Sequence, residues 1–136
     1  MKTTTVRKSS TTSVSSSSPK LLLLMMPSNQ VSGWGLTDGF GDQISDVLNY
    51  VDVKVIGNQE CEELFGSLVS SILCTSGDEY TGSCSGDSGG PLVIDDVQIG
   101  VVSFGIIFCL PGYPSGFSRV TSFLDWIETN SDVQIK

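Results

Sequence analysis

Residues 86 to 92, Gly-Asp-Ser-Gly-Gly-Pro-Leu, restrict the fold of this chain more than any other segment, because they place a serine on a glycine-lined turn. Such a turn can direct backbone N–H groups at a reacting carbonyl, as acyl-transfer enzymes do to hold a developing oxyanion. The sequence contains no histidine, the residue that most often takes the proton from a nucleophilic serine. The segment therefore indicates acyl-transfer chemistry in a chain that lacks the usual base.

The sequence beyond the first 27 residues has the pattern of a small all-β domain. Three valines alternate with other residues over 50–56, which predicts a strand with one buried face. Two apolar runs within 92–104 are separated by Asp95-Asp96 and predict a β-hairpin. Residues 116–120 predict one more strand. Many short strands and fifteen glycines favour a barrel.

Two helical segments are expected. Asn58 is a candidate N-cap for a short acidic helical turn that runs through Glu63. Residues 122–125, Ser-Phe-Leu-Asp, resemble a capping box at the start of a C-terminal helix. Three apolar residues of that helix fall on one face: Phe123, Trp126 and Ile127.

The first 32 residues contain no acidic residue and consist mostly of Ser and Thr. A run such as Thr3–Ser18 buries too little apolar surface to offset the entropy cost of ordering it. We therefore expect residues 1–27 to form a disordered Ser/Thr-rich tail and residues 28–136 to form one domain. The apolar run Leu21–Met26 is too short to cross a bilayer, and a signal peptide, a first strand and a stray gene-model segment are alternative interpretations of it.

The charge of the chain is concentrated beyond the tail. From Gly33 onward there are fifteen acidic residues against three basic ones, which gives that segment a net charge of −12. Phosphate binding requires a cationic surface, so nucleic acid and anionic membranes are not expected partners. A neutral or cationic partner fits this charge better.

The four cysteines allow two interpretations. They contain no Cys-x-x-Cys pair, and no histidine is present to complete a zinc site, so no metal and no cofactor is predicted. A disulfide framework is favoured, and stable disulfides imply an oxidising, secreted or extracellular setting.

A series of blocks in this order resembles the C-terminal half of the chymotrypsin-like serine proteases. The resemblance covers about residues 31–127 and implies an antiparallel six-stranded Greek-key barrel, one of the two barrels of a trypsin-like fold, followed by a C-terminal α-helix. It implies serine endopeptidase activity on protein or peptide substrates. The matching blocks are Val31–Gly35, Cys61, Cys74, Gly82–Leu92, Gly100–Gly105, Cys109 and Tyr113–Val120.

The resemblance also implies roles for individual residues. Ser88 matches the nucleophile, and the N–H groups of Gly86 and Ser88 match the oxyanion hole. Asp87 matches the carboxylate that pairs with the N-terminal ammonium released on activation. The His and Asp of the catalytic triad belong to an N-terminal barrel, which is therefore an expected partner. The implied disulfides join Cys61 to Cys74 and Cys84 to Cys109.

The expected specificity pocket is uncharged. The resemblance places Gly82 at its floor, where a trypsin-like enzyme has an Asp, so a cationic side chain would lose its water without compensation. Gly105 leaves the pocket wall open and Ser115 lies at the far end, which favours a large apolar or aromatic side chain. The expected substrate-binding residues are Gly82, Ser83, Ser85, Ser103, Phe104, Gly105 and Ser115, of which 103–105 match the strand that pairs with the substrate backbone.

Three functions remain open. The first is an active secreted endopeptidase of which this sequence is the C-terminal part, inactive alone because it has no His. The second is a catalytically inactive homologue that binds peptides or another protease. The third is a Ser-Lys enzyme with Lys54 or Lys136 as base. The first is favoured because a homologue without activity has no chemical need to keep the nucleophile motif.

Overall fold

The computed structural model describes residues 4–5 and 28–135. Within this part of the chain, no helix is long and apolar enough to cross a membrane. Of the tail expected over residues 1–27, only Thr4 and Thr5 are described, as a short strand, and the rest of that expectation falls outside the described residues.

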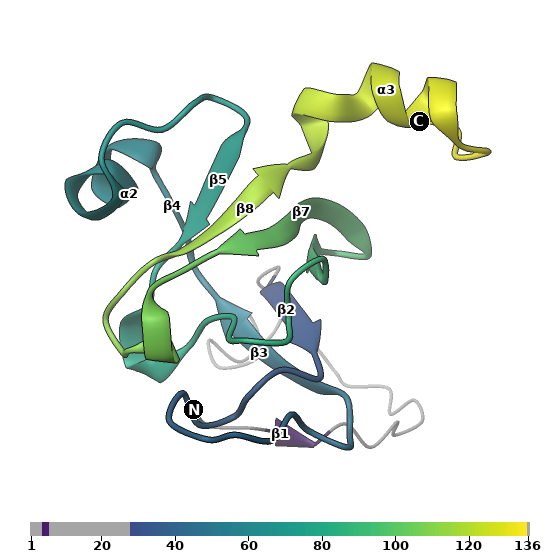
Figure 1. Cartoon of the computed structure of the whole chain (residues 1–136). Coiled ribbons are helices and arrows are strands. Elements are labelled where there is room, and N and C mark those ends of the chain that lie inside the picture. Colours follow the sequence, from purple (N-terminus) through teal and green to yellow (C-terminus); the bar gives the residue numbers. More distant parts are fainter. Residues whose placement is uncertain (1–3, 6–27, 136) are drawn as a thin grey trace, which may run out of the picture.

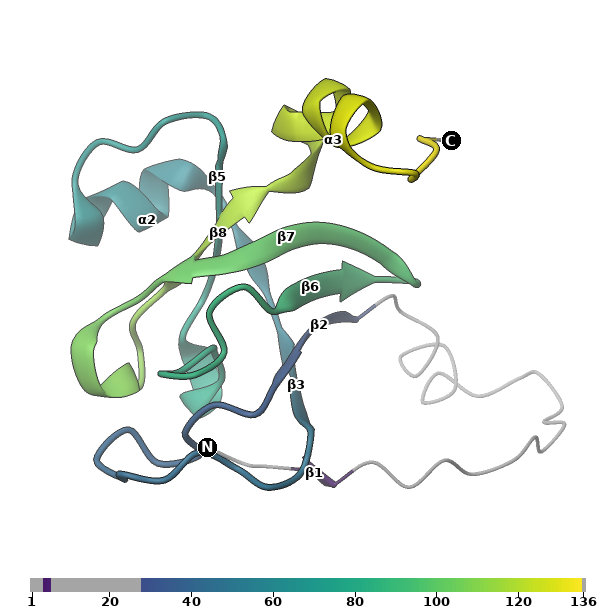
Figure 2. The same cartoon turned by 45° about the vertical axis from the view of Figure 1, so that its right-hand side comes forward.

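The strands form one antiparallel sheet that curls into a barrel (Figure 1), with the order β1-β3-β2-β6-β7-β8-β5-β4. After β5 the chain returns to pair β6 with β2, which is a Greek-key connection. Figure 2 shows β6 between β2 and β7. The bounds are β1 Thr4–Thr5, β2 Asn29–Gly33, β3 Asn49–Val53, β4 Val55–Ile56, β5 Ile72–Thr75, β6 Pro91–Ile94, β7 Val97–Phe104 and β8 Ser115–Arg119.

The segment that contains β3 and β4 closes the barrel. β3 pairs with β2, whereas β4, which follows after the single residue Lys54, pairs with β5. The strand predicted over 50–56 therefore divides at Lys54, because its two ends have different neighbours. Counted as one bent strand, β3 and β4 complete a six-stranded barrel with β2, β5, β6, β7 and β8, which confirms the predicted fold class.

The barrel interior is filled by apolar side chains from several strands. Phe117 on β8 and Leu92 on β6 are fully buried, and they share a cluster with Val31, Val53, Leu73 and Val102. Gly100 makes room for both large side chains, since a Cβ there would lie 3.1 Å from Phe117 and 3.2 Å from Leu92. A second cluster of Ile56, Cys61 and Cys74 holds helix α2 (Asn58–Phe65) against β4 and β5.

The predicted hairpin is confirmed by β6 and β7. Asp95 and Asp96 form its two-residue turn with φ angles of 46° and 66°. A tight turn with positive φ at both central residues matches the right-handed twist of the flanking strands, and Asp tolerates this conformation better than most residues.

Both predicted helices are present, but both predicted caps are wrong. Helix α2 (Asn58–Phe65) begins after Gly57, and the side chain of Asn58 instead donates to the carbonyl of Ile72 (3.1 Å). Ser122 lies within the 3-10 turn η3 (Val120–Phe123), and α3 (Leu124–Asn130) begins without a side-chain cap. An N-cap residue needs a non-helical backbone, and residues 58 and 122 are already helical here.

Helix α3 lies beyond the end of β8 and clear of the barrel in both views (Figures 1 and 2). None of its residues is buried, and the expected apolar face is largely exposed to solvent, with Trp126 65% exposed and Phe123 42% exposed. An apolar helix face of this kind is available for contact with another structural element.

Replacement of Phe117 by Ala removes the largest fully buried side chain of the barrel. We expect the free energy of unfolding to fall by about 3–5 kcal/mol, because transfer and cavity terms add. Val97, which is 60% exposed, provides the control, since Val97→Ala should change the free energy of unfolding by less than about 0.5 kcal/mol. Denaturant unfolding of the oxidised chain measures the free energy of unfolding of both variants. Equal losses in Phe117→Ala and Val97→Ala would contradict the assigned core.

Candidate active site

Ser88 lies on a tight turn that two glycines make possible. Gly86 and Gly89 flank it with φ angles of 98° and 82°, a region that residues with a Cβ seldom occupy. Asp87 N–H donates to the carbonyl of Cys84 (3.0 Å), and Gly89 N–H donates to the carbonyl of Val102 on β7 (2.9 Å). The turn is thus tied both to itself and to the barrel.

The side chain of Asp87 turns inward and connects this turn to the segment after β2. Its Oδ1 accepts a hydrogen bond from Gly35 N–H (2.7 Å), and its Oδ2 accepts one from Cys84 N–H (2.9 Å). Gly33 and Gly35 approach the carboxylate so closely that a Cβ on either would collide with it. The resemblance implied an ammonium partner for Asp87; among the described residues the partners are these two backbone amides. Hydrogen bonds to both oxygens offset the cost of removing the charge from water.

The N–H groups of Gly86 and Ser88 have no acceptor within the part of the chain that the structure describes. Backbone donors of this kind, on either side of a serine, can bind an oxygen atom of a ligand.

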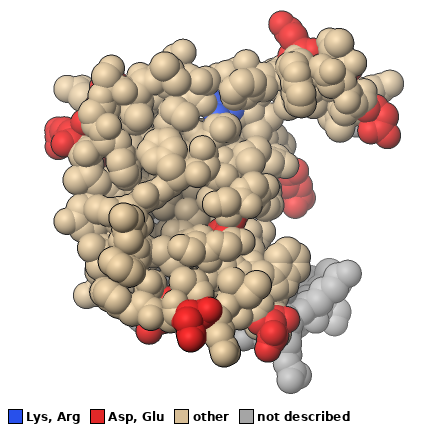
Figure 3. All heavy atoms as spheres, in the orientation of Figure 1, with Lys and Arg blue, Asp and Glu red and all other residues tan. Residues whose placement is uncertain are grey.

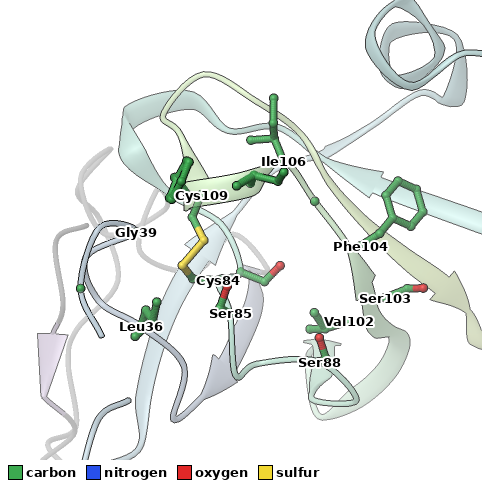
Figure 4. A pocket seen from close by; sticks show the side chains of 15 residues that line it. Leu36, Gly39, Cys84, Ser85, Ser88, Val102, Ser103, Phe104, Ile106 and Cys109 are labelled. Atoms are coloured by element: carbon green, nitrogen blue, oxygen red, sulfur yellow. A yellow bond between two sulfur atoms is a disulfide. The ribbon is translucent and has the colours of Figure 1, made fainter. Parts of the chain in front are cut away.

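A cleft of about 440 Å³ lies beside Ser88. Figure 4 shows Ser88 and Ser103 on one side, Leu36 and Gly39 on the opposite side, and the Cys84–Cys109 disulfide between them. Five of the expected substrate-binding residues line this cleft together with Ser88: Ser83, Ser85, Ser103, Phe104 and Gly105.

Gly82 and Ser115 line a different and much smaller cavity, of about 20 Å³, which shares Ser83 and Gly105 with the cleft. Ser115 is buried and its Oγ accepts a hydrogen bond from Ser83 N–H (3.3 Å). A Cβ on Gly82 would lie 3.1 Å from the same oxygen. The expected pocket floor is therefore uncharged and holds one serine hydroxyl, with space for about one water molecule in this conformation.

The two disulfides have the pairing that the resemblance implied. Cys61 in α2 is joined to Cys74 in β5, and Cys84 beside the Ser88 turn is joined to Cys109. In the chain-entropy account each closed loop stabilises the fold by about 3 kcal/mol. The second disulfide also fixes the distance between the turn and the segment 105–109, so that these two walls of the cleft keep their separation.

One wall of the cleft was not predicted from the sequence. Leu36, Gly39 and Gly41 line it from the segment after β2, which is held in place by the bond from Leu36 N–H to the carbonyl of Ser85 (2.9 Å). No local pattern in residues 36–41 indicates this position, because the contacts that define it join residues about fifty positions apart.

A sequence profile of the family described as Trypsin matches residues 3–127. This chain belongs to the trypsin family of chymotrypsin-like serine proteases. It is 46% identical over 102 residues to a chymotrypsin of Phaedon cochleariae, covering 75% of this chain and 36% of the relative. It is 42% identical over 103 residues to brachyurin of Leptuca pugilator, covering 75% and 46%, and 43% identical over 105 residues to serine protease 1 of Drosophila melanogaster, covering 75% and 39%. The chain therefore spans less than half the length of these relatives.

Of the two lysines considered as an alternative base, Lys54 does not line the Ser88 cleft. Lys54 lines a separate cavity together with Asp52 and Asp78, and Lys136 lies outside the described residues. Among residues 4–5 and 28–135, no three His, Cys, Asp or Glu side chains gather as a metal site would require.

Replacement of Asp87 by Asn should loosen the Ser88 turn. An amide accepts at its oxygen only and is neutral, so one of the two N–H groups loses its acceptor and the other loses a charged one, whose hydrogen bond is worth about 1.5–3 kcal/mol. We expect hydrogen exchange at Gly35 or Cys84 to accelerate by about tenfold or more, as followed by NMR.

The control is Asp95→Asn, which makes the same chemical change in the turn between β6 and β7. Unchanged exchange at both Gly35 and Cys84 in the Asp87 variant would show that the carboxylate does not hold these amides.

Proposed function

We propose that this chain carries the nucleophile and oxyanion-binding groups of a secreted serine endopeptidase. The supporting observation is the position of Ser88, on a turn with two N–H groups free of described acceptors and beside a cleft of about 440 Å³. In the proposed reaction Ser88 Oγ attacks the peptide carbonyl carbon while a base takes its proton. The oxyanion is held by Gly86 and Ser88 N–H until the peptide C–N bond breaks and the amine leaves with that proton. Water then hydrolyses the acyl-enzyme.

The printed sequence has no histidine to act as the base, and the resemblance to the family implies that the base and its carboxylate partner lie upstream. We assign them to an N-terminal barrel, since the relatives are more than twice as long as the segments that match them. The exposed apolar face of α3 and Trp34, which is 53% exposed, offer surface for such a partner. The two disulfides support an extracellular location.

The substrate backbone is proposed to pair with residues 103–105. β6 pairs with β7 only as far as Val101, and the Ser88 turn bonds to Val102 through Gly89 and Gly90. Beyond Val102 the β6 side of β7 has no strand partner among the described residues. An open strand edge beside a nucleophile can hold an extended peptide by β-augmentation.

The alternative is an inactive homologue that binds peptides in the same cleft, which the absence of histidine from the printed sequence favours. The two functions differ in whether a supplied base restores peptide cleavage. In both, the peptide would bind in the cleft and along the open strand edge.

The direct test is fusion of the N-terminal half of one of the relatives upstream of this chain. We expect hydrolysis of peptide substrates in the fusion, because a positioned His and Asp activate Ser88. The chain alone and the fusion carrying Ser88→Ala should be slower by about 10⁶-fold, since loss of the nucleophile or of the base costs about this much. A properly folded fusion without activity would favour the peptide-binding alternative.

The same fusion tests the proposed specificity. With an uncharged floor at Gly82 and Ser115, cleavage is expected after Phe, Tyr or Leu and not after Arg or Lys. Gly82→Asp should shift preference toward Arg and Lys, although the close Ser115 Oγ will limit the change. A peptide library measures this, and cleavage chiefly after Arg or Lys by the unchanged fusion would show that Gly82 is not the floor.

A further inference from the structure

A second cavity, of about 140 Å³, lies next to the cleft and shares Gly39, Phe108 and Cys109 with it. Three aromatic side chains and one carboxylate line it, and they come from three segments that are distant in the sequence. These four residues are Asp38, Phe40, Tyr80 and Phe108.

The three aromatic rings are largely exposed to solvent. Phe40 is 74% exposed, Tyr80 is 65% exposed and Phe108 is 54% exposed. The rings of Phe40 and Phe108 stack, with centroids 5.2 Å apart and an angle of 15° between their planes. The stacked pair joins two walls of the cavity and leaves ring surface in contact with solvent.

The carboxylate of Asp38 has no cationic partner in the described part of the chain. Its Oδ1 accepts a hydrogen bond from the N–H of Phe40 (3.0 Å), which holds the side chain beside that ring. The described basic residues are Lys54 and Arg119. Lys54 lines another cavity, and Arg119 donates to the carbonyls of Ser70 and Ile72.

The backbone around this cavity is held in an uncommon conformation. Tyr80, Phe108 and Cys109 have φ angles of 63°, 65° and 48°, in the left-handed region that side chains with a Cβ disfavour. The other two such residues, Asp95 and Asp96, are accounted for by the β6–β7 turn. Uncommon backbone conformations cluster at binding sites, where the surrounding structure fixes them in advance of the ligand.

We propose that this cavity binds the cationic side chain of a Lys or Arg residue in a peptide that occupies the neighbouring cleft. The proposal rests on the proposed function, because the peptide is the proposed substrate. A cation here is attracted by the faces of the aromatic rings and by the Asp38 carboxylate. Its aliphatic stem packs against Leu110 and Pro111, which also line the cavity.

The charge of the molecule favours the same ligand. Residues from Gly33 onward carry a net charge of −12, which draws cationic peptides toward the surface. On the face in Figure 3, Asp and Glu side chains lie around the rim and a Lys or Arg side chain is visible at one place, near α3. The cation-binding cavity shares Tyr80, Cys109, Leu110 and Pro111 with the small cavity at the uncharged floor, but Gly82 and Ser115 do not line it.

The test measures binding of acetyl-arginine amide to the full oxidised chain by ligand-detected NMR at micromolar protein. Acetyl-citrulline amide, which has nearly the same shape and no charge, is the control ligand. We expect the arginine compound to bind about tenfold more tightly than the citrulline compound, from one exposed ion pair and one cation–π contact. Equal affinities, or no binding of either compound, would overturn the proposal.

Two variants locate the site. Asp38→Asn removes the charge, and Tyr80→Asn removes a ring while keeping a residue that tolerates positive φ. Each should weaken binding of the arginine compound by about threefold. Asp96→Asn makes the same charge change in the distant β6–β7 turn and should leave the affinity unchanged. An equal effect of Asp38→Asn and Asp96→Asn would contradict a local site.

The outcome is independent of catalysis, because the probe is bound and not cleaved. Ser88→Ala should leave the affinity for the arginine compound unchanged. Retained, Asp38-dependent binding in a fusion without protease activity would overturn the proposed function and leave the cation site in place. Loss of arginine binding in an active fusion would overturn the cation site and leave the proposed function in place.

Discussion

The hydrogen bonds that the Asp87 carboxylate accepts from Gly35 and Cys84 connect the parts of this molecule on which its proposed chemistry depends. One oxygen holds the segment after β2, and the other holds the turn that carries Ser88. A charged acceptor suits this position, because two N–H donors from segments about fifty residues apart converge on it and no neutral side chain accepts as strongly. The glycines at 33 and 35 are required because the carboxylate occupies the space that their Cβ atoms would fill.

The barrel supplies the fixed positions from which these loops extend. The bent strand β3–β4 closes it, and the buried Phe117 and Leu92 set its interior. The Cys84–Cys109 disulfide then joins the Ser88 turn to the segment 105–109, which forms another wall of the cleft. The Ser88 turn, the open strand edge and the aromatic cavity are thus connected by backbone and disulfide contacts.

The sequence was informative where local rules decide the structure. Alternating valines predicted the strand over 50–56, and Asp95-Asp96 predicted the hairpin turn. Local rules failed at Asn58 and Ser122, where the path of the chain out of a strand makes the expected cap residue already helical. They also gave no indication of the wall at residues 36–41, which is fixed by contacts distant in the sequence. The sequence motif also did not indicate that Gly82 lines a small cavity next to the cleft and not the cleft itself.

The central proposal is that the turn of this chain carries Ser88 as a nucleophile, which becomes reactive when an N-terminal barrel supplies a base and its carboxylate partner. Labelling with a fluorophosphonate, followed by mass mapping of the modified peptide, tests it most directly in the chain alone and in the fusion with an N-terminal half. The account predicts stoichiometric modification of Ser88 in the fusion and almost none in the chain alone. Rapid, stoichiometric labelling of Ser88 in the chain alone, or labelling of the fusion at another serine of this chain, would contradict it.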